Sequence, residues 1–147
     1  MKFKYEVVSD NNEVSLIGIE GECPEILKIP TFIDVDNKKM KVVRIMFHSI
    51  YYRLKHRGEN GIICKVLYIP ETVEIFSLRH NKYIQEVYLP NSLTKIYNGA
   101  FAHCEELKTV HLPQNLKQIY HGAFSGCKKI ENISIPLTVV KMGNACF

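Results

Sequence analysis

The chain has 147 residues, of which 46% are hydrophobic and 23% are charged, and its formal net charge is +4. This length fits one domain, and the mixing of 19 basic with 15 acidic residues, without a binding motif, argues against a nucleic-acid partner. No apolar run of about 18 residues, export signal or lipidation motif is present, so the chain as written is expected to be soluble and cytoplasmic, without insertion into a membrane.

Residues 1–22 are expected to form a β-hairpin. Phe3, Tyr5 and Val7 alternate with polar residues, turn-forming residues occupy 9–12, and the alternation then resumes. Such alternation is typical of strands that bury one face. We expect this hairpin to cover the first of the repeated units that follow.

Residues 23–69 are interpreted as a degenerate copy of a unit that becomes regular later in the chain. Inside it, residues 33–43 predict a short hairpin around Asp36 and Asn37, a pair typical of turns. Residues 51–63 contain Gly-Glu-Asn-Gly and predict a loop. The loop also holds the densest basic stretch, RLKHR, which is interpreted as a solvated surface rather than as an anion or nucleic-acid contact.

Residues 70–89 form a shorter copy of the same unit. Val73 and Phe76 hold its early apolar positions, and Val87 and Leu89 hold its late ones. The block Gly-Ala-Phe-x-x-Cys, which the next two copies share, is missing here.

The repeat is regular in the last third of the chain. Residues 91–113, NSLTKIYNGAFAHCEELKTVHLP, are followed without a gap by 114–136, QNLKQIYHGAFSGCKKIENISIP, and eight of the 23 positions are identical. With the recurring proline taken as the boundary, the regular repeats are 90–112 and 113–135, and a partial copy occupies 136–147.

A fixed period of this length is the signature of a solenoid, in which each repeat is one coil stacked on the next. Val110 and Leu112 are two residues apart and point to one face of a strand, and stacked coils pair such strands in parallel. The proline ends each strand, since it donates no backbone hydrogen bond. Gly99 and Gly122 fit turns that need positive φ. One phenylalanine per coil is expected to form a spine: Phe101, Phe124 and Phe147.

A candidate binding surface follows from the same alternation. The residue between two inward-facing aliphatic residues must point outward, and stacking aligns these residues in a column: Lys28, Tyr68, Tyr88, His111 and Ser134. The preceding outward column contains Ile26, Val66, Glu86, Thr109 and Asn132. Exposed aromatic side chains in adjacent coils are typical of protein interfaces. The alternative is that such pairs only support the sheet, as we interpret Tyr97 and Tyr120.

Cysteine and histidine residues raise the question of catalysis or metal binding. Cys104 and Cys127 recur with the repeat, which favours small buried side chains, although a disulfide between neighbouring coils stays open. A zinc site that uses both with His103 and His121 lacks the usual ligand spacing, so no metal or cofactor is expected. No catalytic motif occurs and the chain is not expected to be an enzyme, while a Cys–His nucleophilic pair formed in space stays open.

The order of residues 107–127, LKTVHLPQNLKQIYHGAFSGC, resembles the BspA-type leucine-rich repeats of bacterial surface proteins. The resemblance implies a single, mainly β domain over 1–147. It would be a short right-handed solenoid with a parallel sheet on one face, helical or irregular turns on the other, and the N-terminal hairpin as a cap. It also implies a non-catalytic module that binds a protein or extracellular ligand through the strand face, in adhesion or host interaction at the cell surface or in secreted form.

The end of the stack suggests an alternative role. The last full strand, expected near 130–135, has no following strand to pair with, and natural solenoids usually cover such an edge. Three explanations stay open: residues 137–147 fold over the edge, a second chain pairs there, or the array continues. Pairing with a second chain would make this a structural or assembly module that forms a homo-oligomer through its solenoid end.

Overall fold

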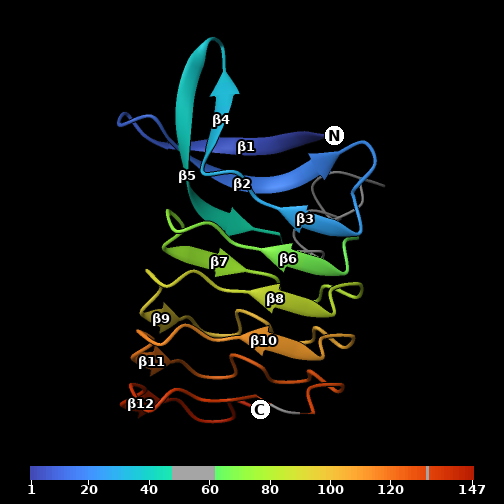
Figure 1. The fold of residues 1–147 in the computed structure, drawn as a ribbon, viewed down its shortest axis with the longest axis vertical. Coiled ribbons are helices and arrows are strands. Elements are labelled where there is room, and N and C mark those ends of the chain that lie inside the picture. The colour runs from blue at the N-terminus through green and yellow to red at the C-terminus, as the bar shows by residue number, and fades with distance from the viewer. Residues whose placement is uncertain (48–61, 132) are drawn as a thin grey trace.

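The computed structural model describes residues 1–47, 62–131 and 133–147. Within these ranges the protein contains twelve strands and no helix, and strands far apart in the sequence lie one above another (Figure 1). The predicted mainly β class is therefore confirmed. No helix in the described part of the chain is long and apolar enough to span a membrane.

The predicted N-terminal hairpin is present and is joined to the repeats through a long strand. Strand β1 (Lys2–Ser9) pairs antiparallel with β2 (Glu13–Glu20). β2 in turn pairs in parallel with β5 (Lys38–Met46), and β5 pairs in parallel with β7 (Ile75–Ser77). The hairpin thus lies at one end of the stack (Figure 1).

The second predicted hairpin is also confirmed. β4 (Phe32–Val35) pairs antiparallel with β5, and the turn between them contains Asp36 and Asn37. Both turn residues have positive φ, 48° and 63°, a conformation that short polar side chains tolerate. Residues 48–50 of the degenerate copy, and the loop expected at 51–63 apart from its last two residues, lie outside the described residues.

One side of the molecule is a four-stranded parallel sheet. Its strands, in spatial order, are β3 (Ile26–Lys28), β6 (Val66–Tyr68), β8 (Glu86–Tyr88) and β10 (Thr109–His111). The central residue of each strand points inward and is buried: Leu27, Leu67, Val87 and Val110. A proline follows two residues after each strand, as expected of a residue that cannot continue the ladder: Pro30, Pro70, Pro90 and Pro113.

The other side carries short parallel strands where helical or irregular turns were expected. β9 (Lys95–Ile96), β11 (Gln118–Ile119) and β12 (Lys141–Met142) form a second parallel sheet, at the left of Figure 1. Backbone N–H groups here bond to the preceding coil: the Tyr120 N–H donates to the Ile96 carbonyl at 2.9 Å. Because these donors are used between coils, they are not available to close helical turns.

Inward-facing rings form the predicted spine. The Phe101 and Phe124 rings are nearly parallel with centroids 5.0 Å apart, and Phe147 stacks on Phe124 at 5.3 Å. Phe101 and Phe124 are fully buried, and burying such a side chain stabilises a fold by roughly 1.5–3 kcal/mol.

The shortened copy, residues 70–89, has a leucine at the spine position that holds phenylalanine in the next coils. The Leu78 N–H donates to the Ala100 carbonyl at 2.7 Å, and one coil later the Phe101 N–H donates to the Ala123 carbonyl at 2.8 Å. Leu78 therefore takes the phenylalanine position. This coil is three residues shorter than the regular repeat, yet its backbone hydrogen bond to the next coil is kept at this position.

A buried asparagine replaces the recurring cysteine in that copy. Asn81 occupies the position that Cys104 holds in the next coil, and it is 3% exposed. Its Nδ2 donates to the Ile62 carbonyl, and its Oδ1 accepts from the Tyr83 and Ile84 N–H groups, each at 2.9 Å. A single amide thereby satisfies two backbone groups of its own coil and one of the preceding coil.

The turn glycines adopt the predicted conformation. Gly99 and Gly122 have φ of 60° and 61°. A Cβ at Gly99 would also meet the guanidinium of Arg79, so this turn needs both positive φ and space. Ala145 occupies the equivalent position in the partial copy with φ of 49°.

The last coil differs from expectation. Residues 133–135 are not in a strand, so the full strand expected near 130–135 is wrong for the described residues. Ile133 and Ile135 are only partly buried, because no further coil packs on their outer side. Residues 137–147 do not fold over the edge; they continue the stack, since β12 pairs with β11.

Candidate binding face

Outward side chains of the four-stranded sheet form a continuous stack. The Tyr68 and Tyr88 rings lie 4.2 Å apart at an angle of 4°, and the His111 ring lies 4.0 Å from Tyr88 at 9°. On the other side of Tyr68, the Lys28 Nζ is 5.3 Å from the ring centroid. These four residues, named the aromatic column, are in register on adjacent strands, as the repeat predicted.

Glu86 connects the aromatic column to the second outward column. Its Oε1 accepts from the Tyr88 hydroxyl at 2.9 Å and lies 2.7 Å from His111 Nε2. The hydrogen bond with His111, and then that with Tyr88, hold the pKa of Glu86 below its usual value. The bond to the carboxylate raises the pKa of Tyr88 to about 12. The Glu86 carboxylate on this face therefore holds the Tyr88 hydroxyl and the His111 Nε2 in place.

The second outward column changes character along the stack. Ile26 and Val66 are paired with each other, and Glu86 and Thr109 continue the same register. Ile26 is 56% exposed, which is unusual for an isoleucine in a sheet. The face is therefore apolar near the hairpin and polar toward β10.

The predicted binding residues are the eight members of the two outward columns other than Ile26 and Val66, and two of the eight do not extend these columns. Ser134 is exposed but belongs to no strand, and Asn132 lies outside the described residues. The structure brings together the other six: Lys28, Tyr68, Glu86, Tyr88, Thr109 and His111.

Ring orientation limits what the aromatic column can contact. The rings of Tyr68, Tyr88 and His111 are nearly parallel and about 4 Å apart, so their faces contact one another. Their edges and polar tips are directed away from the stack. The rings thus support the sheet, while the Lys28 ammonium, the imidazole edge and the Glu86 carboxylate are the groups that a ligand can address.

The cysteines are arranged for structure rather than for reaction. The Cys104 thiol donates to the Leu78 carbonyl at 3.1 Å, and the Cys127 thiol donates to the Phe101 carbonyl at 3.0 Å. Burial raises the pKa of Cys104 to about 12 and that of Cys127 to about 11. All five cysteines are free, so the disulfide between coils is not formed.

The histidines considered for a zinc site are placed differently from that hypothesis. The His103 ring stacks on His80, with centroids 4.7 Å apart, instead of joining a thiol. In residues 1–47, 62–131 and 133–147, no group of three or more His, Cys, Asp or Glu side chains could hold a metal ion.

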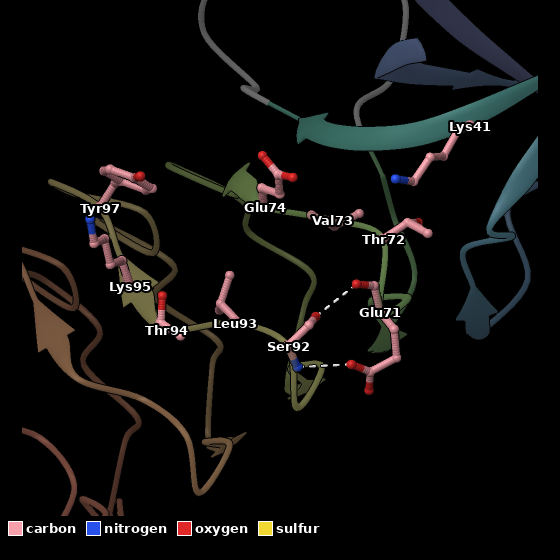
Figure 2. Close-up of a pocket in the computed structure, with 10 residues that line it drawn as sticks. All are labelled: Lys41, Glu71, Thr72, Val73, Glu74, Ser92, Leu93, Thr94, Lys95 and Tyr97. Atoms are coloured by element: carbon pink, nitrogen blue, oxygen red, sulfur yellow. Dashed lines mark hydrogen bonds between the residues drawn. The ribbon is translucent and has the colours of Figure 1, made fainter. Parts of the chain in front are cut away.

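A separate groove of about 420 Å³ lies beside β5, β7 and β9, and sequence reasoning missed it (Figure 2). The Glu71 carboxylate accepts from the N–H groups of Asn91 and Ser92 at 2.9 and 2.8 Å, which lowers the pKa of Glu71. Lys41 and Lys95 border the same groove. The repeat gave no signal for this groove, because Lys41 lies outside the regular repeats that contain Lys95.

With this geometry established, the family can be assigned. Residues 71–147 match the family model described as BspA type leucine rich repeat region, in six copies, and the match spans more than half of the chain. The chain belongs to the BspA-type leucine-rich repeat family. No curated protein matches this BspA-type chain.

Solved structures of bacterial leucine-rich repeat proteins share the fold. A leucine-rich repeat protein from Bacteroides ovatus has a TM-score of 0.78 at 25% identity, covering 100% of this chain and 37% of that one. The pneumococcal vaccine antigen PcpA has a TM-score of 0.66 at 20% identity, covering 99% and 45%. A protein from Bacteroides capillosus has a TM-score of 0.50 at 19% identity, covering 97% and 88%. The BspA-type chain thus spans less than half the length of the first two.

Proposed function

We propose that this chain is a non-catalytic module that binds a protein or another extracellular ligand through the face formed by the aromatic column and Glu86. Leucine-rich repeat proteins typically act by binding, and stacked repeats create extended faces suited to it. The single observation that carries the proposal is the register of Lys28, Tyr68, Tyr88 and His111, with Glu86 bonded to two of them. Adhesion or host interaction, at the cell surface or in secreted form, is the setting that the family suggests.

We also propose that residues 1–147 form one right-handed solenoid domain with the repeat boundaries derived above. The parallel strand order in both sheets supports it, because each strand of a repeat pairs with its counterpart in the next. A single rigid body of this kind would hold the binding face flat over several coils.

The binding face is tested by comparing two double variants with matched chemistry. Tyr88→Ala with His111→Ala removes the centre of the face, and Tyr97→Ala with His121→Ala removes the same residue types outside it. Immobilised proteins are incubated with extracellular-matrix and cell-surface extracts, and bound proteins are quantified by mass spectrometry. We expect the wild type and the second variant to capture the same proteins and the first variant to lose them. Equal capture by all three would refute the proposed face.

A second candidate is an assembly module, and one observation favours it. Apolar side chains of the last coil are strongly exposed: Leu137 is 103% accessible, Val140 79% and Phe147 56%. A second chain that covered them would bury apolar surface and pair with the outer edge of β12. Light scattering at two concentrations decides this: a mass that stays monomeric, with Ile133 amide exchange independent of concentration, eliminates assembly through this end.

A further inference from the structure

The side of the molecule that carries β9, β11 and β12 has lysines that no carboxylate neutralises. Four of them, named the basic side, are Lys41, Lys95, Lys117 and Lys141, and none forms an ion pair within the described part of the chain. Three other lysines do pair with glutamates of the preceding coil, at 2.7–2.9 Å: Glu25–Lys65, Glu105–Lys128 and Glu106–Lys129. Unlike these three lysines, those of the basic side carry a positive charge that no carboxylate pairs with in the described residues.

The repeat places these lysines in a line along the stack. Lys95 and Lys141 occupy the same register position two coils apart, with Gln118 between them. The Lys117 N–H donates to the Thr94 carbonyl at 2.8 Å, so Lys117 lies one coil beyond the groove that Thr94 lines. Lys41 borders the other end of that groove, beyond Glu74 (Figure 2). The basic side thus continues from β5 to β12.

Acidic groups on this side lie toward its Lys41 end, where Glu13 is in register with Lys41 and two further carboxylates line the groove. The Glu71 carboxylate is held by the N–H groups of Asn91 and Ser92. Glu74 is the one other carboxylate that lines the groove. Lys95, Lys117 and Lys141 are exposed, and Lys41 is half-buried. An anionic ligand would meet three exposed ammonium groups from Lys95 to Lys141 without an intervening carboxylate.

The spacing and the rings define the kind of anion. Coils repeat about every 4.8 Å, so Lys95 and Lys141 lie roughly 10 Å apart, which suits a polymer rather than a single ion. Tyr120 stacks on Tyr97 at 5.6 Å, and the Lys141 Nζ covers its ring at 5.9 Å. With both faces of Tyr120 occupied, this ring offers no platform for a nucleic-acid base. Charged groups and hydroxyls can bind here; bases have no ring face on Tyr120 to stack upon.

We propose that the basic side binds an anionic polysaccharide, with Lys95, Lys117 and Lys141 contacting its sulfate, phosphate or carboxylate groups. This site is separate from the face formed by the aromatic column and Glu86. One chain therefore presents two surfaces of different chemistry, on opposite sheets of the same stack.

The test uses the full chain with dextran sulfate, and uncharged dextran as the matched polymer. A triple variant, Lys95→Gln, Lys117→Gln and Lys141→Gln, is compared with a charge-matched control, Lys38→Gln, Lys82→Gln and Lys108→Gln. We expect the wild type to bind dextran sulfate in a salt-dependent manner and to ignore dextran. Loss of three contacts should weaken binding at least about tenfold, and the control should stay within about twofold of the wild type.

Several results would overturn the inference. Binding that falls equally in the triple variant and its control would show an effect of net charge alone, and absence of wild-type binding would remove the site. Tighter binding of oligothymidylate than of dextran sulfate would replace the polysaccharide with nucleic acid. Loss of dextran sulfate binding in the Tyr88→Ala/His111→Ala variant would place the ligand on the other sheet. Thermal melts establish that each variant is folded, and single substitutions of Lys95 and Lys141 provide a second measurement.

Discussion

Single side chains in this chain act mainly between neighbouring coils. Glu71 accepts from backbone N–H groups one coil further on, and Cys104 donates to a carbonyl of the coil before it. Asn81 does the same with Ile62 where the cysteine is missing. Each of these side chains therefore adds a hydrogen bond between coils to those that the backbone makes.

The Glu71 contact predicts a pH-dependent loss of stability. Glu71→Ala removes the acceptor of two N–H groups, and since these are exposed to water we expect a cost of only about 1 kcal/mol at pH 7. The pKa of Glu71 is lowered in the fold, so its stabilisation is present above the ordinary value of 4.5 and is lost as pH falls through the folded pKa. Urea denaturation at pH 7 and at pH values below 4.5 measures the difference.

Glu74→Ala is the control, because Glu74 lines the same groove and its carboxylate, unlike that of Glu71, accepts no hydrogen bond in the described structure. It should change the free energy of unfolding by less than about 0.5 kcal/mol. A difference between wild type and Glu71→Ala that stays constant with pH would contradict the assigned role of the carboxylate.

Burial of Cys104 predicts that its thiol is inert in the folded protein. With its pKa raised to about 12 and no exposed surface, Cys104 has almost no thiolate at pH 8. We expect an aromatic disulfide reagent to label Cys104 only after unfolding, while half-buried Cys23 serves as the internal comparison. Peptide mapping by mass spectrometry gives both rates. Modification of native Cys104 as fast as that of Cys23 would show that the coil opens there.

At the scale of strands and turns, the period determined what could be predicted. The strand-ending prolines, Gly99, Gly122 and the phenylalanine spine were predicted correctly because equivalent positions share one environment. The aromatic column followed from the same register. Features carried by non-repeating residues were missed, such as Asn81 in the place of Cys104, since nothing in a single copy shows which coil lies above it. The short β9 and β11 strands were missed because two-residue elements leave no alternation to detect.

The turn position shared by Gly99, Gly122 and Ala145 predicts a stabilising substitution. Ala145 has φ of 49°, where a residue with a Cβ is strained by roughly 1–2 kcal/mol. Ala145→Gly should relieve the strain and, after the larger entropy loss of glycine, stabilise the protein by about 0.5–1 kcal/mol in urea denaturation. Gly122→Ala is the matched opposite: a Cβ there has only ordinary contacts at 3.8 and 3.9 Å, so φ alone should cost about 1 kcal/mol. The same sign for both substitutions would contradict the assignment of this position.

At the scale of the whole molecule, the described residues form three sheets around one core: two parallel sheets, and a mixed sheet that joins the hairpin to the stack. Each described strand between β3 and β12 pairs with an equivalent one from another coil, apart from the antiparallel β4. The hairpin is joined to this arrangement because β2 pairs with β5, and β5 in turn pairs with β7. Stability in such an array is shared between neighbours, so no coil is expected to unfold by itself.

Because stability is shared, a destabilising substitution at either end of the stack should lower the free energy of unfolding at both ends. Leu16 is a buried residue of β2 in the hairpin, and Phe124 is a buried residue near the other end of the stack. Leu16→Ala should cost about 2–5 kcal/mol and Phe124→Ala about 3–5 kcal/mol, large fractions of the ~5–15 kcal/mol that hold a typical domain together. Native-state hydrogen exchange at amides of β2 and β11 measures the effect at each end. In one cooperative domain, each substitution lowers protection in both strands by the same free energy. If Leu16→Ala lowered protection in β2 and left β11 unchanged, the hairpin and the repeats would be separate folding units, and the single domain proposed for 1–147 would be wrong.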